Sequence, residues 1–237
     1  MRPTRIRDNK MEFFDRTKAI LFNPKEEWTI IEAENASHAK VFAGHLLILA
    51  LIPAAAIFFN YWWSWNSTYT DAINQFGGYS KDMANMLKER MPFDAKWGII
   101  TAVQQLVIIL GGAYLTAVVI NAFSDQFGSA KDFNRAFALV AYSYTPLCVA
   151  GILYIYSPLA FLVPLAGCYG LYLLYLGSES QLKPAADKKV ICFIISLIAV
   201  IVVWAVLSKI VPTITQSILI EQAKNDGLRN LQNLMPR

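Results

Sequence analysis

The amino-acid sequence predicts an all-α membrane protein with five transmembrane helices, and two observations lead to that prediction. Hydrophobic residues make up 56% of the chain and charged residues only 16%, whereas a soluble domain carries about 25% charged residues. Charged side chains are also absent from four long runs, residues 41 to 70, 97 to 124, 136 to 178 and 190 to 208. A hydrocarbon core about 30 Å thick is crossed by roughly 20 helical residues, so three runs hold one span each and the longest holds two.

The longest run divides at Ser157 and Pro158, because proline blocks the continuation of a helix and disfavours helical backbone in the residue before it. The predicted spans are about 41–63, 98–122, 136–156, 159–177 and 190–211. Around them lie an N-terminal segment 1–40, an outer loop 64–96 and an outer amphipathic tail 212–237, which we expect to break at Gly227. Buried helices of a soluble protein would show recurring polar stripes, and "LLILALIPAAAIFF" has none.

The distribution of basic residues predicts that the N-terminus is inside and the C-terminus outside. With the N-terminus inside, 13 of the 21 Lys and Arg residues fall on the inner segments and 8 on the outer ones, as the positive-inside rule favours. The first apolar run begins only at Val41, so we expect no cleaved signal peptide. We expect the first span to act as an uncleaved targeting signal. We expect a multi-pass protein of a bacterial inner membrane.

The segment "MEFFDRTKAILF" before the first span has the pattern of a helix that lies in the inner membrane interface. Its apolar side chains fall within about 100° of arc on a helical wheel, with Arg16 and Lys18 on the flanks. Such a helix places Phe13 and Phe14 among the lipids and its cations toward anionic headgroups of the inner leaflet. Pro24 then ends this helix or begins a second one that returns Trp28 to the interface. An amphipathic helix packed on a protein partner is the alternative interpretation.

Three further stretches are informative: "NPKEEW", "FNRAFALVAYSYTP" at 133–146 and "GLYLLYLG" at 170–177. Together they resemble the Yip family of polytopic membrane proteins, in its prokaryotic branch, and the resemblance covers roughly residues 11 to 211. The resemblance implies a five-helix membrane domain with a cytosolic N-terminus. Eukaryotic members are associated with small Rab-type GTPases and vesicle traffic. This chain lacks their Asp-Leu-Tyr-Gly-Pro type segment, so we do not carry over the GTPase association.

Uncharged polar residues within the spans provide the candidate binding positions. Gln104 and Gln105 lie in the second predicted span, Asn121 lies at its inner end and Tyr142 lies in the third. Buried amides and hydroxyls in membranes most often bond across helices, each contributing about 0.6 kcal/mol on average. The alternative is that Gln104, Asn121 and Tyr142 line the path of a small transporter or channel. The spans hold no ionisable residue near their centres that would carry protons.

The motif "AYSYTP" is a structural hinge or a candidate binding motif formed by Tyr142, Ser143, Thr145 and Pro146. Pro146 has no amide hydrogen to donate to the carbonyl of Tyr142, so the helix bends or another group satisfies that oxygen. We favour the hinge, with the hydroxyls of Ser143 and Thr145 available to the freed carbonyl.

Catalytic and metal sites are not predicted. Cys148, Cys168 and Cys192 all fall within predicted spans, and the only histidines are His38 and His45, which leaves no metal-ligand or catalytic-triad spacing. We therefore expect no enzyme, no cofactor and no nucleic-acid ligand. The sequence favours an integral membrane scaffold or adaptor that binds lipid, other membrane proteins or copies of itself.

Overall fold

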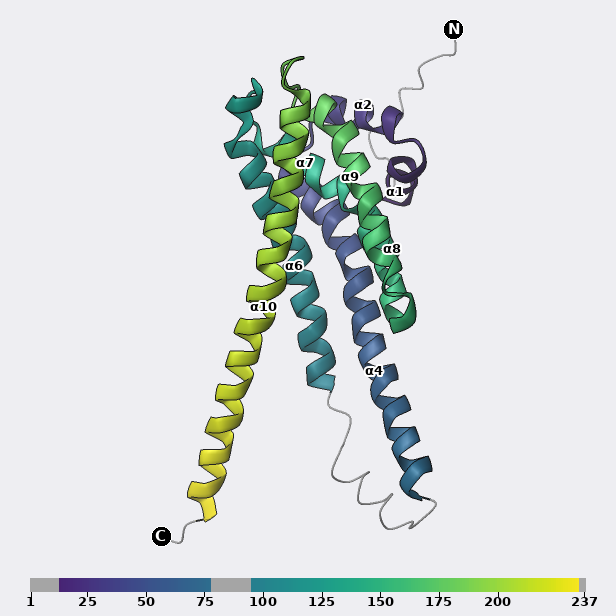
Figure 1. The fold of residues 1–237 in the computed structure, drawn as a ribbon, viewed down its shortest axis with the longest axis vertical. Coiled ribbons are helices and arrows are strands. Elements are labelled where there is room, and N and C mark those ends of the chain that lie inside the picture. Colours follow the sequence, from purple (N-terminus) through teal and green to yellow (C-terminus); the bar gives the residue numbers. More distant parts are fainter. Residues whose placement is uncertain (1–12, 78–94, 235–237) are drawn as a thin grey trace.

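The computed structural model describes residues 13–77 and 95–234, and these residues form a bundle of helices (Figure 1). Five helical segments are long and apolar enough to cross a membrane, which confirms the predicted fold class: His38–Ser64, Ala95–Ala122, Phe133–Ile155, Ser157–Gln181 and Lys189–Glu221. The first helix and the far end of the last helix lie at opposite ends of the molecule (Figure 1). We call the end that carries the first helix the N-terminal end.

Two short helices form a hairpin ahead of the first span. Helix α1 (Phe13–Phe22) is followed directly by α2 (Pro24–Glu34), whose first residue is the proline that the sequence analysis singled out. Proline suits this position because its missing amide hydrogen would have no helical partner. Asn35 then ends α2 in the left-handed conformation with φ 42°, as helix caps often do.

The first span is one nearly continuous helical rod. It comprises α3 (His38–Val41), a π-helical turn η1 (Phe42–Leu46) and α4 (Leu47–Gly77). Helix α4 thus continues well past residue 63, where we had expected the outer loop to begin. The amide of Asn60 donates to the Ile155 carbonyl at 3.0 Å and to the Ser157 hydroxyl at 2.9 Å, which ties α4 to the turn between the third and fourth spans.

The remaining helices complete the bundle. They are α6 (Ala95–Ala122), η2 (Ser124–Phe127), α7 (Phe133–Ser143), α8 (Thr145–Ala150), η3 (Gly151–Ile155), η4 (Ser157–Leu159), α9 (Leu162–Gln181) and α10 (Lys189–Leu234). Helix α10 runs through Pro212 and Gly227. The prediction that the helix breaks at Gly227 is therefore wrong. Within this helix the Thr213 hydroxyl donates to the Lys209 carbonyl at 2.7 Å.

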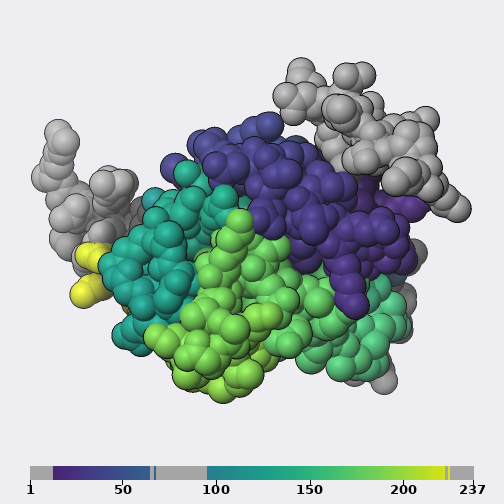
Figure 2. Space-filling model, turned by 90° about the horizontal axis from the view of Figure 1, so that it is seen from above, coloured from purple at the N-terminus to yellow at the C-terminus, as the bar shows by residue number. Residues whose placement is uncertain are grey.

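The hydrophobic core is concentrated at the N-terminal end. Side chains from α1, α2, η1, α7 and α9 are fully buried there, including Ile20, Leu46, Phe137 and Leu173 at 0% exposure. Seen from this end, the early helices, the segment after α6 and the segment between α9 and α10 lie side by side (Figure 2). Toward the other end α4 and α10 diverge (Figure 1), and one side of α10 presents a row of exposed isoleucines.

Candidate functional site

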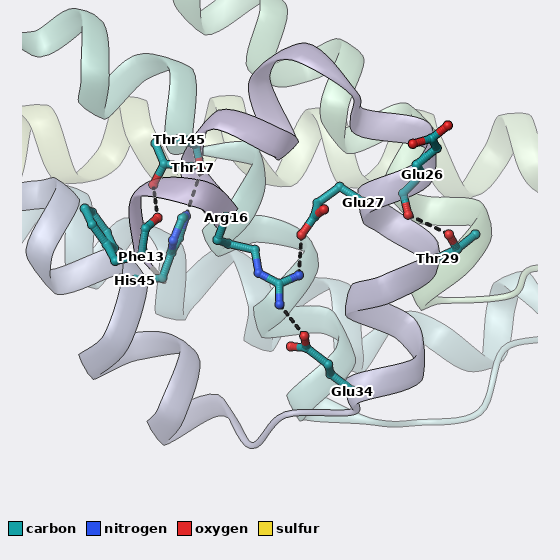
Figure 3. Close-up of polar contacts among 9 residues, drawn as sticks. All are labelled: Phe13, Arg16, Thr17, Glu26, Glu27, Thr29, Glu34, His45 and Thr145. Atoms are coloured by element: carbon teal, nitrogen blue, oxygen red, sulfur yellow. Dashed lines mark hydrogen bonds and ion pairs between the residues drawn. The ribbon is translucent and has the colours of Figure 1, made fainter. Parts of the chain in front are cut away.

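A buried ion-pair cluster lies inside the N-terminal hairpin. Arg16 of α1 is 6% exposed, and its guanidinium donates to both Glu27 and Glu34 of α2 (Figure 3). The two glutamates are seven positions apart, so two helical turns bring them to the same face. Burial alone would lower the pKa of the Arg16 guanidinium. The nearby oxygen atoms of Tyr142, Glu34 and Glu27 favour its charged form more strongly, so the pKa is raised above its ordinary value. The cluster therefore joins α1 to α2.

Tyr142 of α7 connects this cluster to the membrane bundle. Its ring centroid lies 6.2 Å from that of Trp28, with the rings perpendicular, and 4.5 Å from that of His45. The Arg16 guanidinium carbon lies 5.9 Å from the same ring, within the range of a cation–π interaction. Tyr142 is thus the point where side chains from α1, α2 and η1 meet α7.

His45 lies in the π-helical turn of the first span. Its Nε2 atom is 3.0 Å from the Thr145 hydroxyl (Figure 3), and it is 3% exposed. The π-turn is a local widening of the helix, of a kind that often occurs at functional sites. The other ring nitrogen, Nδ1, is buried without a hydrogen-bond partner among the described residues.

Glycines on α9 let the hairpin and the hinge approach closely. A Cβ atom at Gly177 would lie 2.5 Å from the Trp28 ring and 2.7 Å from Leu139, and one at Gly170 would lie 2.6 Å from the Ser143 carbonyl oxygen. Any side chain at these positions would collide with its neighbours. The Trp28 ring therefore occupies space that only a glycine leaves free.

The "AYSYTP" motif coincides with an interruption of the third span. Helix α7 ends at Ser143, Tyr144 forms a turn, and α8 begins at Thr145 with Pro146 in its first turn. Proline in that position removes a hydrogen bond that a continuous helix would need. The Ser143 hydroxyl is buried and has no partner among the described residues. The interruption turns Thr145 toward His45.

A small pocket opens beside Tyr142 at the N-terminal end. Its wall comes from the end of α2 and the two residues after it, the end of α3, one side of α7 and the end of α9. Glu34, Arg135, Tyr142 and Gln181 are among the polar side chains that line it. Gln104, Gln105 and Asn121 do not line it; they are half-buried on α6. Gln104 and Asn121 are about 25 Å apart along the helix axis at 1.5 Å per residue, so no single local site joins them.

The residues predicted to anchor the N-terminal segment in the membrane interface fall into two groups, some exposed and some buried against protein. Phe14 is 78% exposed, Lys18 is also exposed, and Phe13 is half-buried with its ring 5.8 Å from that of His45. Arg16 and Trp28 are buried, at 6% and 2% exposure. Both were expected to face lipid, and both instead contact protein.

Sequence reasoning missed several members of the cluster. It did not connect Glu27 and Glu34 with Arg16, nor Gly177 with Trp28. The signal was present in part, because the seven-residue spacing of the two glutamates predicts a shared helix face. Among the described residues, no three His, Cys, Asp or Glu side chains lie close enough to hold a metal ion.

Comparison with known proteins agrees with this arrangement. The profile of the Yip1 domain matches residues 18–207, a range that contains the second half of α1, the whole of α2 and all five spans up to the middle of α10. No curated protein and no solved structure matches the chain. The three stretches with a Yip-like sequence lie around Trp28: "NPKEEW" supplies Trp28 itself, "FNRAFALVAYSYTP" supplies Tyr142 beside its ring, and "GLYLLYLG" supplies Gly177 against the same ring. The chain belongs to the Yip1 family.

Proposed function

We propose that this protein is an integral membrane scaffold or adaptor, which binds lipid and other membrane proteins or copies of itself and carries out no chemistry of its own. The observation that carries the proposal is that polar side chains at the N-terminal end contact other side chains of the same chain. Arg16 bonds both Glu27 and Glu34, and His45 contacts Thr145. The first set joins the two helices of the hairpin and the second joins the first span to α8, so these groups serve assembly more readily than turnover.

The hairpin is the lipid-binding part of the proposal. Phe14 and Phe22 are 78% and 74% exposed on α1, and rings of this kind partition into the acyl boundary of a bilayer. The Tyr169 hydroxyl donates to the Leu21 carbonyl at 2.7 Å. Tyr169 lies about 18 Å along α9 from its end at Gln181, which supports a position of α1 within the leaflet. Lys18 would then meet anionic headgroups.

The exposed side of α10 is the proposed surface for protein partners. Ile194, Ile198 and Ile201 recur at helical spacing and are 45%, 53% and 54% exposed. A second copy or another membrane helix could pack along them.

We place the protein in a bacterial inner membrane with its N-terminus in the cytoplasm, and reporter fusions at residues 2 and 237 should then report opposite compartments. Matching compartments would contradict this orientation.

The decisive experiment is site-specific photocrosslinking in native membranes. A crosslinker at Ile198, on the exposed side of α10, should give discrete protein adducts, whereas one at Val140, which is 0% exposed, should give none. If the crosslinker at Ile198 reacted only with lipid, the result would contradict the adaptor proposal.

A transporter with a path near Gln104, Asn121 and Tyr142 is the competing proposal. Reconstituted vesicles distinguish the two. The double variant Tyr142→Phe/Ser143→Ala should leave solute flux at the background level of empty vesicles, as should the unaltered protein. A flux that this variant abolishes, with folding unchanged, would favour the transporter.

A further inference from the structure

One side of α6 carries a row of residues at the spacing of a coiled coil, and the other helices leave that row uncovered. The row advances by alternating steps of three and four residues, as positions a and d of a heptad do, and we call it the α6 seam. Its members are Trp97, Ile100, Gln104, Val107, Gly111, Tyr114 and Val118. None of these seven described residues is buried, and four of them are between 42% and 47% exposed. The seam is about 32 Å long, close to the thickness of the hydrocarbon core.

Gln104 places an unpaired amide in the α6 seam. The side chain is half-buried and makes no hydrogen bond to the part of the chain that the structure describes. It lies about 10 Å along the helix axis from Trp97. Trp97 of α6 is 45% exposed, and Trp62 and Trp63 of α4 are 47% and 61% exposed, as expected for tryptophans at a membrane interface. Gln104 therefore lies within the hydrocarbon, where an amide without a partner is costly.

The neighbouring amide, Gln105, is directed to the other side of the helix. It lies about 100° further round α6, on the side of the buried residues Gly98 and Gly112. A Cβ atom at Gly98 would lie 3.0 Å from the Phe58 ring of α4, and one at Gly112 would lie 3.7 Å from Leu207 of α10. Helices α4 and α10, which flank α6 (Figure 1), thus cover this side. The two glutamines share a depth but not a face.

The α6 seam has room for a further helix. Gly111 is the next a position after Gln104, and a Cβ atom there would meet nothing closer than the Leu207 side chain at 3.9 Å. Small residues let membrane helices approach closely, and side-chain amides form hydrogen bonds across them. A single polar residue at an a position also fixes the register of two helices. The seam combines these features on one uncovered face.

A second copy of this chain fits the α6 seam better than an unrelated helix does. Two copies with the same topology place Gln104 at the same depth, and a two-fold axis along the membrane normal brings their a positions face to face. A carboxamide carries both donors and an acceptor, so two Gln104 side chains can satisfy each other. An unrelated helix would have to carry its own polar group at this depth.

We propose that the protein forms a parallel homodimer through the α6 seam, in which the Gln104 side chains of the two copies hydrogen-bond each other. The inference deepens the part of the proposed function in which the protein binds copies of itself, and it rests on that part. It assigns self-association to α6 and leaves the exposed side of α10 to other membrane proteins.

The test uses the full-length chain in phosphatidylcholine vesicles, with donor-labelled and acceptor-labelled protein mixed at decreasing protein-to-lipid ratios. Energy transfer should fall on dilution along a monomer–dimer curve. Gln104→Leu should raise the dissociation constant on the order of 10-fold, as expected for two lost hydrogen bonds between membrane helices. Gln104 bonds nothing in its own described chain, so this variant should fold normally. Gln105→Leu makes the same change at the same depth on the covered side, and its dissociation constant should not change.

Disulfide crosslinking with an added copper oxidant locates the interface. Val107→Cys lies in the α6 seam at a position that is 47% exposed, and it should give a crosslinked dimer. Ile99→Cys is the matched control, because Ile99 is 54% exposed but lies about 100° from the middle of the seam, and it should give none. The unaltered protein supplies the background from the exposed native Cys168.

Three results would overturn the proposal. Energy transfer at the background level for the unaltered protein at every ratio would show a monomer. An unchanged dissociation constant in Gln104→Leu, or an equal rise in Gln105→Leu, would remove the Gln104 amide from the interface. A dimer that crosslinks through Ile198→Cys and not through Val107→Cys would move self-association to α10. Photocrosslinking to other proteins at Ile198 in native membranes is independent of these measurements, so the adaptor proposal and the α6 dimer can fail separately.

Discussion

The N-terminal end and helix α10 are built on different principles. In the most apolar part of Phe133–Ile155, 67% of the residues are buried inside the protein, whereas in Lys189–Glu221 only 22% are. The third span is enclosed by the hairpin, the first span and α9. Helix α10 packs on α6 and α9 along one side and leaves the other side uncovered.

The difference shows where this sequence is constrained. A side chain at the N-terminal end must fit several neighbours at once, so a small change in volume or charge there is costly. A residue on the outer side of α10 must only be apolar enough for lipid. Substitutions in matched pairs, each an enclosed position and a more open control, test this contrast.

The largest effect is expected for Arg16→Ala. The substitution removes the guanidinium that bonds Glu27, which is 3% exposed, and breaking a buried ion pair from one side costs about 3–5 kcal/mol. Denaturation of the purified protein in detergent would measure the loss. Lys18→Ala on the exposed face of the same helix is the control and should cost less than about 0.5 kcal/mol. Equal costs for the two variants would mean that the cluster does not hold the hairpin.

Gly177→Ala should have the next largest effect. The added methyl group would lie 2.5 Å from the Trp28 ring, and overpacking of this kind costs about 1–3 kcal/mol. The hairpin would be displaced from α9, so the fluorescence of Trp28 should also shift. Gly111→Ala on α6 is the matched control, because its nearest neighbour would be at 3.9 Å, and it should be neutral or slightly stabilising. A neutral Gly177→Ala would contradict the close fit.

Thr145→Val should have an effect of similar size. It removes the hydroxyl that lies 3.0 Å from His45 Nε2 and leaves a buried ring without that partner, at a cost of about 1–3 kcal/mol. Thr213→Val serves as the control, because that exposed hydroxyl bonds a carbonyl of its own helix and its loss should cost less than about 0.5 kcal/mol. Thermal unfolding compares the pair. A Thr145→Val variant as stable as the control would show that water replaces the hydroxyl.

The sequence predicts much of the fold because membrane spans depend on local composition. Uncharged runs are visible without any knowledge of contacts, and so are the proline at the start of α2 and the one in the hinge. The length of α10 was harder to predict. Pro212 and Gly227 are residues that usually end helices, but α10 continues through both to Leu234.

The cluster around Arg16 could not be predicted in the same way. A helical wheel identifies a charged flank but does not say whether lipid or protein covers it. Arg16 and Lys18 look alike on that wheel, yet Arg16 is buried and Lys18 is exposed. The difference depends on α2 folding back beside α1, which brings Glu27 and Glu34 to one of the two cations. Contacts between segments far apart in the sequence, such as His45 with Thr145, are likewise invisible to periodicity.

The smallest effect is expected on the outer side of α10, and it tests what that side is for. Ile218 is 53% exposed, while Ile20 of α1 is 0% exposed. Ile20→Thr should cost about 2 kcal/mol or more, because it buries a hydroxyl and removes core volume. Ile218→Thr should change the free energy of unfolding by less than about 0.5 kcal/mol. If α10 binds a protein partner along this row, crosslinked adducts should nevertheless decrease in Ile218→Thr at unchanged stability, because the hydroxyl weakens an interface that only the complex buries. Unchanged adducts together with unchanged stability would mean that Ile218 does not contribute to the partner interface and would restrict partner binding to the rest of the molecule.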